Sequence, residues 1–301
     1  MVEHLPGLQG GLWGVLATPF AGPRLAVDEE SLLRQVHLYR ELPATGLVVL
    51  GVFGEGAALD STEQRAVVTA VHRERGPLPI VVGLSARSTA AAVEQAQSCS
   101  AAASDGVAAL MVQVHSPKPD VVVRHLHEIH AASGTGIVVQ DYPLVSGVQI
   151  ATPDLIAVVA DCPFVVAVKS ERPPTGAVIA ELTAGTHVPV FGGLGGVGLL
   201  DELVAGAAGA MTGFSYPEGL LQALEGWREG GYPAASAAFQ PWLPLAVFEA
   251  QPGIGLAIRK ESLRLRGVIA ESVVRPPAPP MPELVRPALT AHLSEVRGLV
   301  A

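Results

Sequence analysis

Cysteine is scarce in this sequence. Only Cys99 and Cys162 occur among its 301 residues, and each falls within an apolar stretch. Two cysteines are too few to stabilise a secreted fold of this length through disulfides, and a reduced, buried thiol is the common state of a cysteine in apolar surroundings. The sequence therefore favours a reducing compartment, and we expect a cytoplasmic protein.

Positive charge is scarce as well. The 19 Lys and Arg residues are outnumbered by 28 Asp and Glu residues, which gives a net charge of −9, and no basic block occurs. Because proteins hold nucleic-acid phosphates with clustered positive charge, we expect no nucleic-acid partner. No apolar run approaches the length of a membrane span, and the amino terminus lacks a basic region followed by an apolar one, so we expect neither membrane insertion nor export.

Apolar surface, by contrast, is abundant. Hydrophobic residues make up 49% of the chain and the mean hydropathy is +0.40, which indicates a folded protein. Short runs rich in Val, Ile and Leu recur without polar alternation, as is typical of parallel strands buried on both faces. The runs are Gly14–Thr18, Gly46–Leu50, Pro79–Val82, Val107–Val112, Gly136–Gln140, Phe164–Lys169, Val188–Phe191 and Ala208–Thr212.

Helix-like segments lie between these runs, and several begin with good capping residues. The expected starts are Asp28 ahead of 29–40, Ser61 in a capping box with Gln64, Ser88 ahead of 89–102, and Thr152 followed by Pro153 at the first helical position. Eight buried parallel strands, each followed by a helix, close most economically as a (β/α)8 TIM barrel. We assign residues 1–225 to this barrel.

The strand pattern stops after Tyr216-Pro217, so residues 226–301 are expected to form a helical region packed on the barrel. Helical segments are predicted at 232–248, 253–266 and 281–300. A proline-rich run at 275–280 precedes the last of them. We interpret this run as a rigid elbow, while a flexible linker or a proline-rich ligand segment is the alternative.

Lys169 is one of only three lysines, and it closes the apolar run that begins at Phe164. The active site of such a barrel is built at the carboxyl ends of the strands. There, confinement disfavours the charge of an ammonium group and lowers its pKa, and the resulting amine can attack a ketone to form a Schiff base without a metal. The alternative is that Lys169 extends to solvent or pairs with Glu171.

Two loops supply further polar groups at the same end of the barrel. The stretch Gly51-Val52-Phe53-Gly54-Glu55-Gly56 follows the second run, and its glycines allow successive backbone N–H groups to turn toward one carboxylate. Together with Lys169 this suggests a 2-oxo acid as ligand, although glycines also make plain tight turns. Gln140-Asp141-Tyr142-Pro143 ends the fifth run, and Tyr142 could move protons or merely cap the barrel.

In order and spacing, these motifs resemble the dihydrodipicolinate synthase and N-acetylneuraminate lyase superfamily of class I Schiff-base aldolases over nearly the full chain. The markers are Ala17-Thr18-Pro19-Phe20, Gly51-Val52-Phe53-Gly54-Glu55, Gln140-Asp141-Tyr142-Pro143 with Gly147, Lys169, Gly192-Gly193 and Gly206-Ala207-Ala208-Gly209-Ala210.

The resemblance also implies roles and assembly. Lys169 would be the Schiff-base lysine, and the protein would form a homo-oligomer, a tetramer or a dimer. The residues implied for substrate binding are Val52 and Phe53, whose amides hold the carboxylate, Gly54 and Glu55 of the same loop, and Gly193 and Met211 in the pocket wall.

Departures from the family pattern bear on the reaction. Members that make dihydrodipicolinate usually carry hydroxyls where Val52 and Phe53 stand, and a tyrosine where Gln140 stands. The arginine that grips a second carboxylate corresponds to Val145, and a tyrosine lent by a neighbouring subunit falls near Val114. These departures make a genuine 4-hydroxy-tetrahydrodipicolinate synthase the weaker alternative.

The Gln-Asp-Tyr-Pro motif is similar to that of branches acting on 2-keto-3-deoxy sugar acids as dehydratases or aldolases. Tyr142 lies two residues beyond Gln140, hence on the same face if the chain is extended, and could serve as acid and base. A water molecule held by Gln140 could do so equally.

Two other patterns bear on whether the protein binds a dinucleotide or a metal. Residues 193–198 satisfy the Gly-x-Gly-x-x-Gly pattern of dinucleotide sites with Glu218 as the acid, but the acid lies beyond a further strand, so we expect no dinucleotide. His125, His127 and His130 are spaced for different sides of a helix, so we expect no metal site.

The sequence thus predicts a lyase that needs neither metal nor cofactor, with Lys169, Gln140 and Tyr142 as catalytic residues. Its substrate would be pyruvate or a 2-keto-3-deoxy sugar acid, and its reaction aldol cleavage, condensation or dehydration. The alternative from another class is a catalytically silent relative that binds a keto acid, because the relay hydroxyls are missing.

Overall fold

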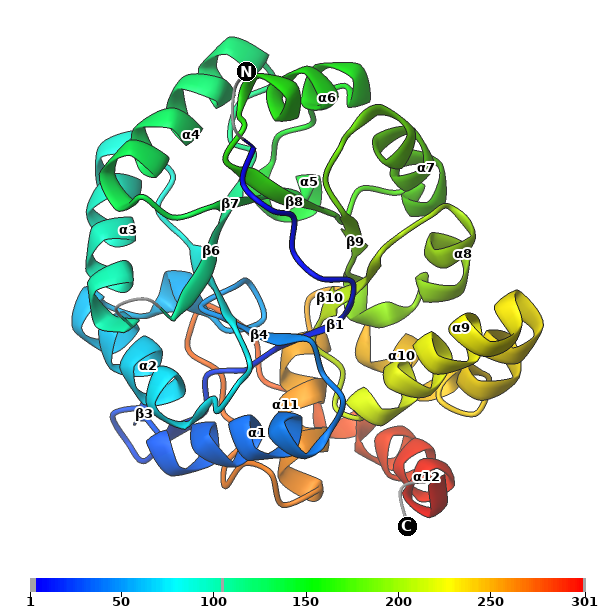
Figure 1. Cartoon of the computed structure of the whole chain (residues 1–301). Helices are drawn as coiled ribbons and strands as arrows, with labels where there is room; N and C mark the ends of the chain where they lie inside the picture. The colour runs from blue at the N-terminus through cyan, green and yellow to red at the C-terminus, as the bar shows by residue number, and fades with distance from the viewer. Residues whose placement is uncertain (1–3, 104–105, 300–301) are drawn as a thin grey trace.

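A closed barrel of eight parallel strands forms the centre of the molecule. The computed structural model describes residues 4–103 and 106–299. Around the barrel the strand order is β1, β10, β9, β8, β7, β6, β5 and β4, and β4 pairs with β1 to close the sheet. Figure 1 looks along the barrel and shows the helices as an outer ring around the strands. The predicted (β/α)8 TIM barrel is confirmed.

Seven of the eight strands lie close to their expected positions. The barrel strands are Gly11–Val15 (β1), Gly46–Val49 (β4), Ile80–Leu84 (β5), Val107–Gln113 (β6), Ile137–Asp141 (β7), Val165–Ser170 (β8), Val190–Gly192 (β9) and Gly209–Thr212 (β10). The first was expected at 14–18, but its pairing with β10 begins at Gly11. After it, Phe20–Ala21 (β2) and Ala26–Val27 (β3) form a small antiparallel hairpin.

The helices around the barrel are Glu29–Glu41 (α1), Ser61–Glu74 (α2), Thr89–Ala103 (α3), Pro119–Ser133 (α4), Pro143–Ser146 (α5), Thr152–Asp161 (α6), Thr175–Gly185 (α7), Leu199–Val204 (α8) and Pro217–Phe239 (α9). Asp28 caps α1 as predicted. Two other caps lie one residue earlier than expected.

These two differences have local causes. The capping box of α2 joins Asp60 to Glu63, because Asp60 already accepts from the amides of the first turn. Helix α6 is capped by Ala151 without a side-chain bond. The Thr152 hydroxyl accepts a hydrogen bond from Arg172 Nη2 at 2.8 Å instead.

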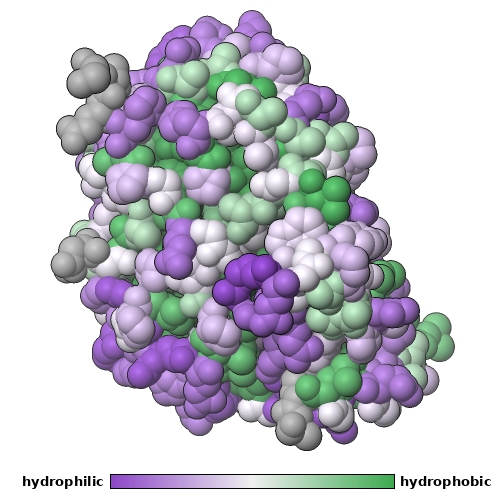
Figure 2. Space-filling model, turned by 45° about the vertical axis from the view of Figure 1, so that its right-hand side comes forward, coloured by the Kyte–Doolittle hydropathy of each residue, from purple (hydrophilic) through white to green (hydrophobic). Residues whose placement is uncertain are grey.

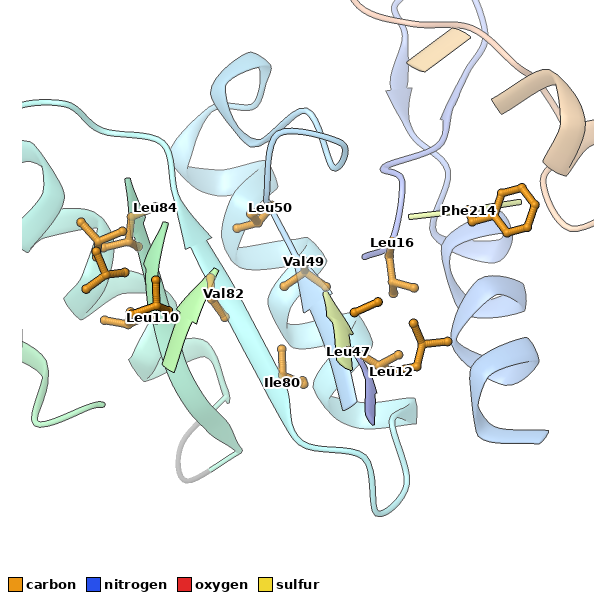
Figure 3. Packing of buried hydrophobic residues seen from close by; sticks show 14 of the residues in the cluster. Leu12, Leu16, Leu47, Val49, Leu50, Ile80, Val82, Leu84, Leu110 and Phe214 are labelled. Atoms are coloured by element: carbon orange, nitrogen blue, oxygen red, sulfur yellow. The ribbon is translucent and has the colours of Figure 1, made fainter. Parts of the chain in front are cut away.

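The strands separate two apolar layers, as side-chain alternation requires. Inward-facing residues such as Trp13, Val48 and Val81 fill the barrel interior. Outward-facing residues such as Leu47 and Ile80 pack against the helices, and Figure 3 shows part of this outer layer between strands and helices. Both layers are closed to solvent, so polar groups inside the barrel are confined to its ends.

The C-terminal region comprises Leu243–Glu249 (α10), Gly255–Leu265 (α11) and Arg286–Val296 (α12). The expected division at 225/226 falls inside α9, whose backbone leaves helical geometry only at Gly230 and Gly231. The segment expected as one helix over 232–248 is divided between α9 and α10. Helix α10 contacts α11, α12 and the turn Leu194–Gly196, and Figure 1 shows the C-terminal helices, in orange and red, in the lower part of the view.

The proline-rich run is fixed to the barrel, in agreement with the rigid elbow. The guanidinium of Arg275 donates to the Ala58 carbonyl at 2.9 Å from Nη1 and pairs with the Glu63 carboxylate. The Arg275 amide donates to Glu55 Oε2 at 2.9 Å. These bonds tie the elbow to the loop after β4 and to α2.

The outer surface is mixed in polarity. Figure 2 shows polar residues interspersed with apolar ones over the face it presents. Within 4–103 and 106–299, no helix is both long and apolar enough to cross a membrane.

Candidate active site

Lys169 lies near the carboxyl end of β8, where the strand enters the mouth of the barrel. It is in register with Gln140 of β7 and with Phe191 of β9, and it is only 5% exposed. Its Nζ lies 3.1 Å from Oε2 of Glu171. The alternative that Lys169 extends to solvent is therefore wrong, whereas the pairing with Glu171 is present.

Glu171 is the best-anchored acidic group of this site. Residues two apart on a strand face the same side, which brings Glu171 next to Lys169. Its Oε2 also accepts from Gln140 Nε2 at 2.6 Å, and its Oε1 accepts from the Leu194 amide at 3.1 Å. A Cβ at Gly193 would overlap this carboxylate, so the glycine permits its placement. A buried carboxylate fixed beside an amine can exchange protons with it.

Lys169 and Glu171 open into a cavity of about 480 Å³. The barrel contributes the loops after β4, β7, β9 and β10, and the C-terminal region contributes the segment from Glu249 to Arg259. Of the residues predicted from the sequence, Val52, Phe53, Tyr142 and Lys169 line this cavity. The C-terminal region thus forms part of the wall of the site.

The loop after β4 borders the cavity through Val52 and Phe53, and it carries backbone donors that are unpaired among the described residues. The amides of Val52, Phe53 and Gly54 have no acceptor among the residues that the structure describes. The loop is fixed to the segment after β1, because Thr18 Oγ1 donates to the Gly54 carbonyl at 2.6 Å. Successive unpaired N–H groups of this kind suit an anionic ligand.

Tyr142 and Gln140 occupy different places in the site. Burial raises the pKa of Tyr142, the neighbouring Glu171 raises it further, and Arg259 opposes them. Tyr142 is therefore a neutral phenol at the cavity wall over the ordinary pH range. Gln140 does not reach this cavity and instead donates its side-chain amide to Glu171, which makes it a positioning residue.

Glu55 is turned away from the cavity that contains Lys169. Its carboxylate forms a buried ion pair with Lys260 of α11, and it accepts the Arg275 amide. The structure thus assigns Glu55 to holding the loop rather than to direct ligand contact, because its oxygens are already bonded to these partners.

Three other residues expected at the substrate lie just behind the cavity wall. Gly54 does not line the cavity, and a Cβ there would approach the backbone of Leu50 and Leu16, while Gly193 abuts Glu171. Met211 is fully buried in the barrel interior. The residues that follow in the chain line the cavity instead, namely Leu194 and Gly195 after β9, and Thr212 and Gly213 at the end of β10. For Gly193 and Met211, the lining residues are thus the next ones in the chain.

Arg259 of α11 was not found from the sequence. It lines the cavity, and its guanidinium lies over the Phe53 ring, with Cζ 5.4 Å from the ring centroid. The only sequence signal is a basic pair, Arg259-Lys260, directly after the apolar stretch Gly255-Leu256-Ala257-Ile258. Only the packing of α11 on the barrel mouth shows that Arg259 of this pair lines the cavity.

Asp141 and Arg172 stabilise the strand ends next to the site. Arg172 Nε donates to Asp141 Oδ2 at 2.8 Å, and the side chain of Asp141 is fully buried. The Glu171 amide donates to the Asp141 carbonyl at 2.8 Å, which continues the ladder between β7 and β8. These bonds fix the backbone from which Glu171 projects.

The glycine-rich pattern at 193–198 and the histidines of α4 have structural roles. Residues 194–196, within the Gly-x-Gly-x-x-Gly pattern, form a 3-10 turn at the cavity wall. His125 and His130 bond to Thr89 Oγ1 and the Thr135 carbonyl, both at 2.9 Å. Among the described residues, no group of three or more His, Cys, Asp or Glu side chains is arranged to hold a metal ion.

Comparison with known proteins identifies the family. The profile of the dihydrodipicolinate synthetase family matches residues 9–296. The chain belongs to this family. A member of it, the L-2-keto-3-deoxyarabonate dehydratase of Azospirillum brasilense, is 32% identical over 285 residues, covering 91% of this chain and 89% of the relative.

Other similar members of the family are named as synthases. The 4-hydroxy-tetrahydrodipicolinate synthase of Synechococcus sp. (strain CC9902) is 27% identical over 295 residues, covering 96% of this chain and 95% of the relative. The crystal structure of dihydrodipicolinate synthase from Rhodopseudomonas palustris is 28% identical and matches with a TM-score of 0.89 over 98% of this chain and all of that one. The family is thus one of lyases that includes both a dehydratase and synthases.

Proposed function

We propose that this chain is a Schiff-base lyase that dehydrates a 2-keto-3-deoxy sugar acid, with Lys169 as the nucleophile and Glu171 as the acid and base. The observation that carries the proposal is the buried contact of 3.1 Å between Lys169 Nζ and Glu171 Oε2 at the wall of the cavity. The 32% identity with a relative named as a 2-keto-3-deoxyarabonate dehydratase supports this choice of reaction.

The first stage forms the imine. The Lys169 ammonium passes a proton to Glu171, and the neutral amine attacks the C2 carbonyl carbon to give a carbinolamine. Glu171 returns the proton to the carbinolamine hydroxyl, which leaves as water, and the carboxylate is restored beside the iminium. The C1 carboxylate accepts from the amides of Val52 and Phe53. This role is supported because both residues line the cavity and their amides have no acceptor among the described residues.

The second stage removes water from the substrate. The iminium acidifies the C3–H bond, Glu171 removes that proton, and the electron pair forms an enamine. Glu171 then returns the proton to the C4 hydroxyl as it departs, so that water leaves and an unsaturated iminium remains. Hydrolysis consumes the water equivalent released in imine formation and restores the Lys169 ammonium, and the net change is loss of one water from the substrate.

Aldol cleavage uses the same imine but requires a base at the C4 hydroxyl rather than at C3. Tyr142 is a neutral phenol in the cavity wall and is a poor base at ordinary pH, because burial raises its pKa. Glu171, which reaches the C4 hydroxyl in the dehydration, would have to be that base as well, so the choice of dehydration over cleavage rests on the named relative. A keto-acid-binding protein without turnover, and a 4-hydroxy-tetrahydrodipicolinate synthase, are the outcomes that the experiment must separate.

The test combines borohydride trapping with turnover. Pyruvate and borohydride should add mass at Lys169 in the wild type, and Lys169→Ala should show no adduct while keeping its fold. Incubation with a panel of 2-keto-3-deoxy pentonates, hexonates and hexarates should then release a dehydrated product, without pyruvate, from at least one member. Absence of any adduct would overturn the Schiff-base proposal, and an adduct without turnover on the whole panel would support the binding-only alternative. Formation of 4-hydroxy-tetrahydrodipicolinate would instead support the synthase.

We also propose that the chain assembles as a homo-oligomer, a tetramer or a dimer, as the family resemblance implies. Sedimentation velocity at several concentrations tests this proposal, and a single monomeric species would contradict it.

A further inference from the structure

Arg259 is a largely buried cation in the cavity wall, and no described residue forms a hydrogen bond with it. Its side chain is 13% exposed, yet none of its nitrogens makes a hydrogen bond to the residues that the structure describes. A buried guanidinium left without hydrogen bonds carries a desolvation cost, which a bound acceptor would offset. Its setting therefore points to a ligand group.

The carboxylate of Glu249 does not form a hydrogen bond with Arg259. Glu249 Oε2 is 3.9 Å from Arg259 Nε, which is too long for a hydrogen bond. The Glu249 carboxylate accepts instead from the amide and the hydroxyl of Ser215, with 3.1 Å between Ser215 N and Glu249 Oε2. Arg259 thus has a counter-charge nearby, while its donors remain available.

Two neighbours fix the guanidinium in place at the cavity wall. The Phe53 ring lies against one side of it. A Cβ at Gly195 would overlap Nη2, and Gly195 has φ +74°, so only a glycine fits this turn comfortably. Arg259 is therefore held by packing, with its polar edge free for a ligand that enters the cavity.

We propose that Arg259 binds a second carboxylate, at the end of the substrate distal to its keto group. The preferred substrates would then be 2-keto-3-deoxy sugar acids with an acid group at both ends. The proposal rests on the proposed function, because the imine at Lys169 and the amides of Val52 and Phe53 fix the keto end of the substrate.

A carboxylate suits this position better than a hydroxyl. The planar guanidinium presents parallel N–H groups that match the two oxygens of a carboxylate, whereas a hydroxyl oxygen engages the fork at a single atom. The first carboxylate has its own donors in the loop after β4, and Lys169 is already paired with Glu171. Arg259 is therefore the cation left for a second acid group among the residues lining this cavity.

The test compares two 2-oxo acids of equal chain length. 2-Oxoglutarate has a distal carboxylate, and 2-oxopentanoate has a methyl group in its place. By calorimetry the wild type should bind 2-oxoglutarate about tenfold to hundredfold more tightly, the range expected for a charge-assisted hydrogen-bonded pair. In Arg259→Leu the two affinities should become equal, while pyruvate, which has no distal group, should still be trapped at Lys169.

Matched controls separate charge from general damage. Arg264 lies on the same helix and pairs with Glu261, with Nε 2.7 Å from Oε2, so Arg264→Leu should keep the wild-type preference. If Arg259→Leu does not fold, Arg259→Gln carries the test, since a neutral polar side chain should also lose the preference.

Two results would overturn the proposal: equal affinity of the wild type for both acids, or an undiminished preference in the neutral Arg259 variants. Its failure is distinguishable from that of the proposed function. Lack of pyruvate trapping at Lys169 would remove the imine, whereas the calorimetric comparison judges Arg259 without requiring an imine to form.

Discussion

Lys260 of α11 and Glu55 of the loop after β4 form an ion pair that is closed to solvent. The Lys260 side chain is 0% exposed and that of Glu55 is 5% exposed. Lys260 Nζ also donates to the Val273 carbonyl at 2.9 Å. Because Glu55 follows the free amides of the loop, this pair couples the C-terminal region to the proposed carboxylate site.

Breaking this pair should destabilise the protein. Lys260→Met leaves the Glu55 carboxylate buried without its main partner, and we expect the free energy of unfolding to fall by about 3–5 kcal/mol. Urea denaturation measures this change. Combining Lys260→Met with Glu55→Gln should recover part of the loss, because the second substitution removes the unpaired charge. A single variant as stable as the wild type would contradict the prediction.

Glu171→Gln should separate imine formation from dehydration. The amide cannot take the C3 proton or return it to the C4 hydroxyl, so we expect kcat to fall by about 10²–10⁴, the usual contribution of a general acid and base. Borohydride should still trap the adduct at Lys169 on long incubation. Single-turnover kinetics with a 2-keto-3-deoxy acid measures the dehydration step directly.

Tyr142→Phe is the matched control for this variant, since Tyr142 lines the same cavity and is one of the two acid and base candidates from the sequence, beside a water molecule held by Gln140. It should lower kcat far less than Glu171→Gln. The reverse order of the two effects would assign the proton transfers to Tyr142.

The pair of Asp141 and Arg172 should matter for stability beside the site. Arg172→Leu leaves the fully buried Asp141 carboxylate without its partner, and we expect a loss of about 3–5 kcal/mol in the free energy of unfolding. Asp141→Asn keeps an acceptor for Arg172 Nε and should cost less. Equal losses in the two variants, measured by urea denaturation, would argue against an unpaired charge as the cause.

Much of this architecture was predictable because local pattern and fold agree. Apolar runs without alternation located seven strands, and Lys169 stood out because it ends such a run. The first strand was misplaced because Gly11 and Gly14 lack side chains that show strand preference, and only the pairing with β10 defines its start. Sequence preference alone could not supply that long-range pairing.

The site was predictable only where a residue's neighbours in the chain decide its position. Glu171 faces Lys169 because residues two apart in an extended chain lie on the same side. The sequence contains this spacing, but the spacing alone indicates an ion pair and not a proton-transfer role. Arg259 lines the cavity because α11 packs on the barrel mouth. The Glu55 side chain points away from this cavity because it pairs with Lys260. Both depend on contacts between segments far apart in the chain, which periodicity and capping do not encode.

Glu202 of α8 is a buried carboxyl group outside the proposed reaction. It is 0% exposed, and neither of its oxygens has a hydrogen-bond partner among the described residues. A Cβ at Gly192 would overlap Oε2, so the side chain is packed against the end of β9. Burial is the main cause that raises the pKa of Glu202 to about 7, and the nearby Glu171 adds to it.

This pKa makes stability depend on pH in a definite direction. The folded state holds a proton on Glu202 up to about pH 7, whereas the unfolded chain releases it near 4.5, so the folded state binds more protons between these values. The contribution of Glu202 is therefore fully present below about pH 4.5 and is lost as the pH rises through about 7, by an amount on the order of 3 kcal/mol. Glu202→Gln should lack this loss and be more stable than the wild type above about pH 7. Urea denaturation across this range checks it, with Glu181→Gln, at an exposed position of the neighbouring helix α7, as the control. Identical pH profiles for Glu202→Gln and the wild type would show that Glu202 titrates normally in the folded protein.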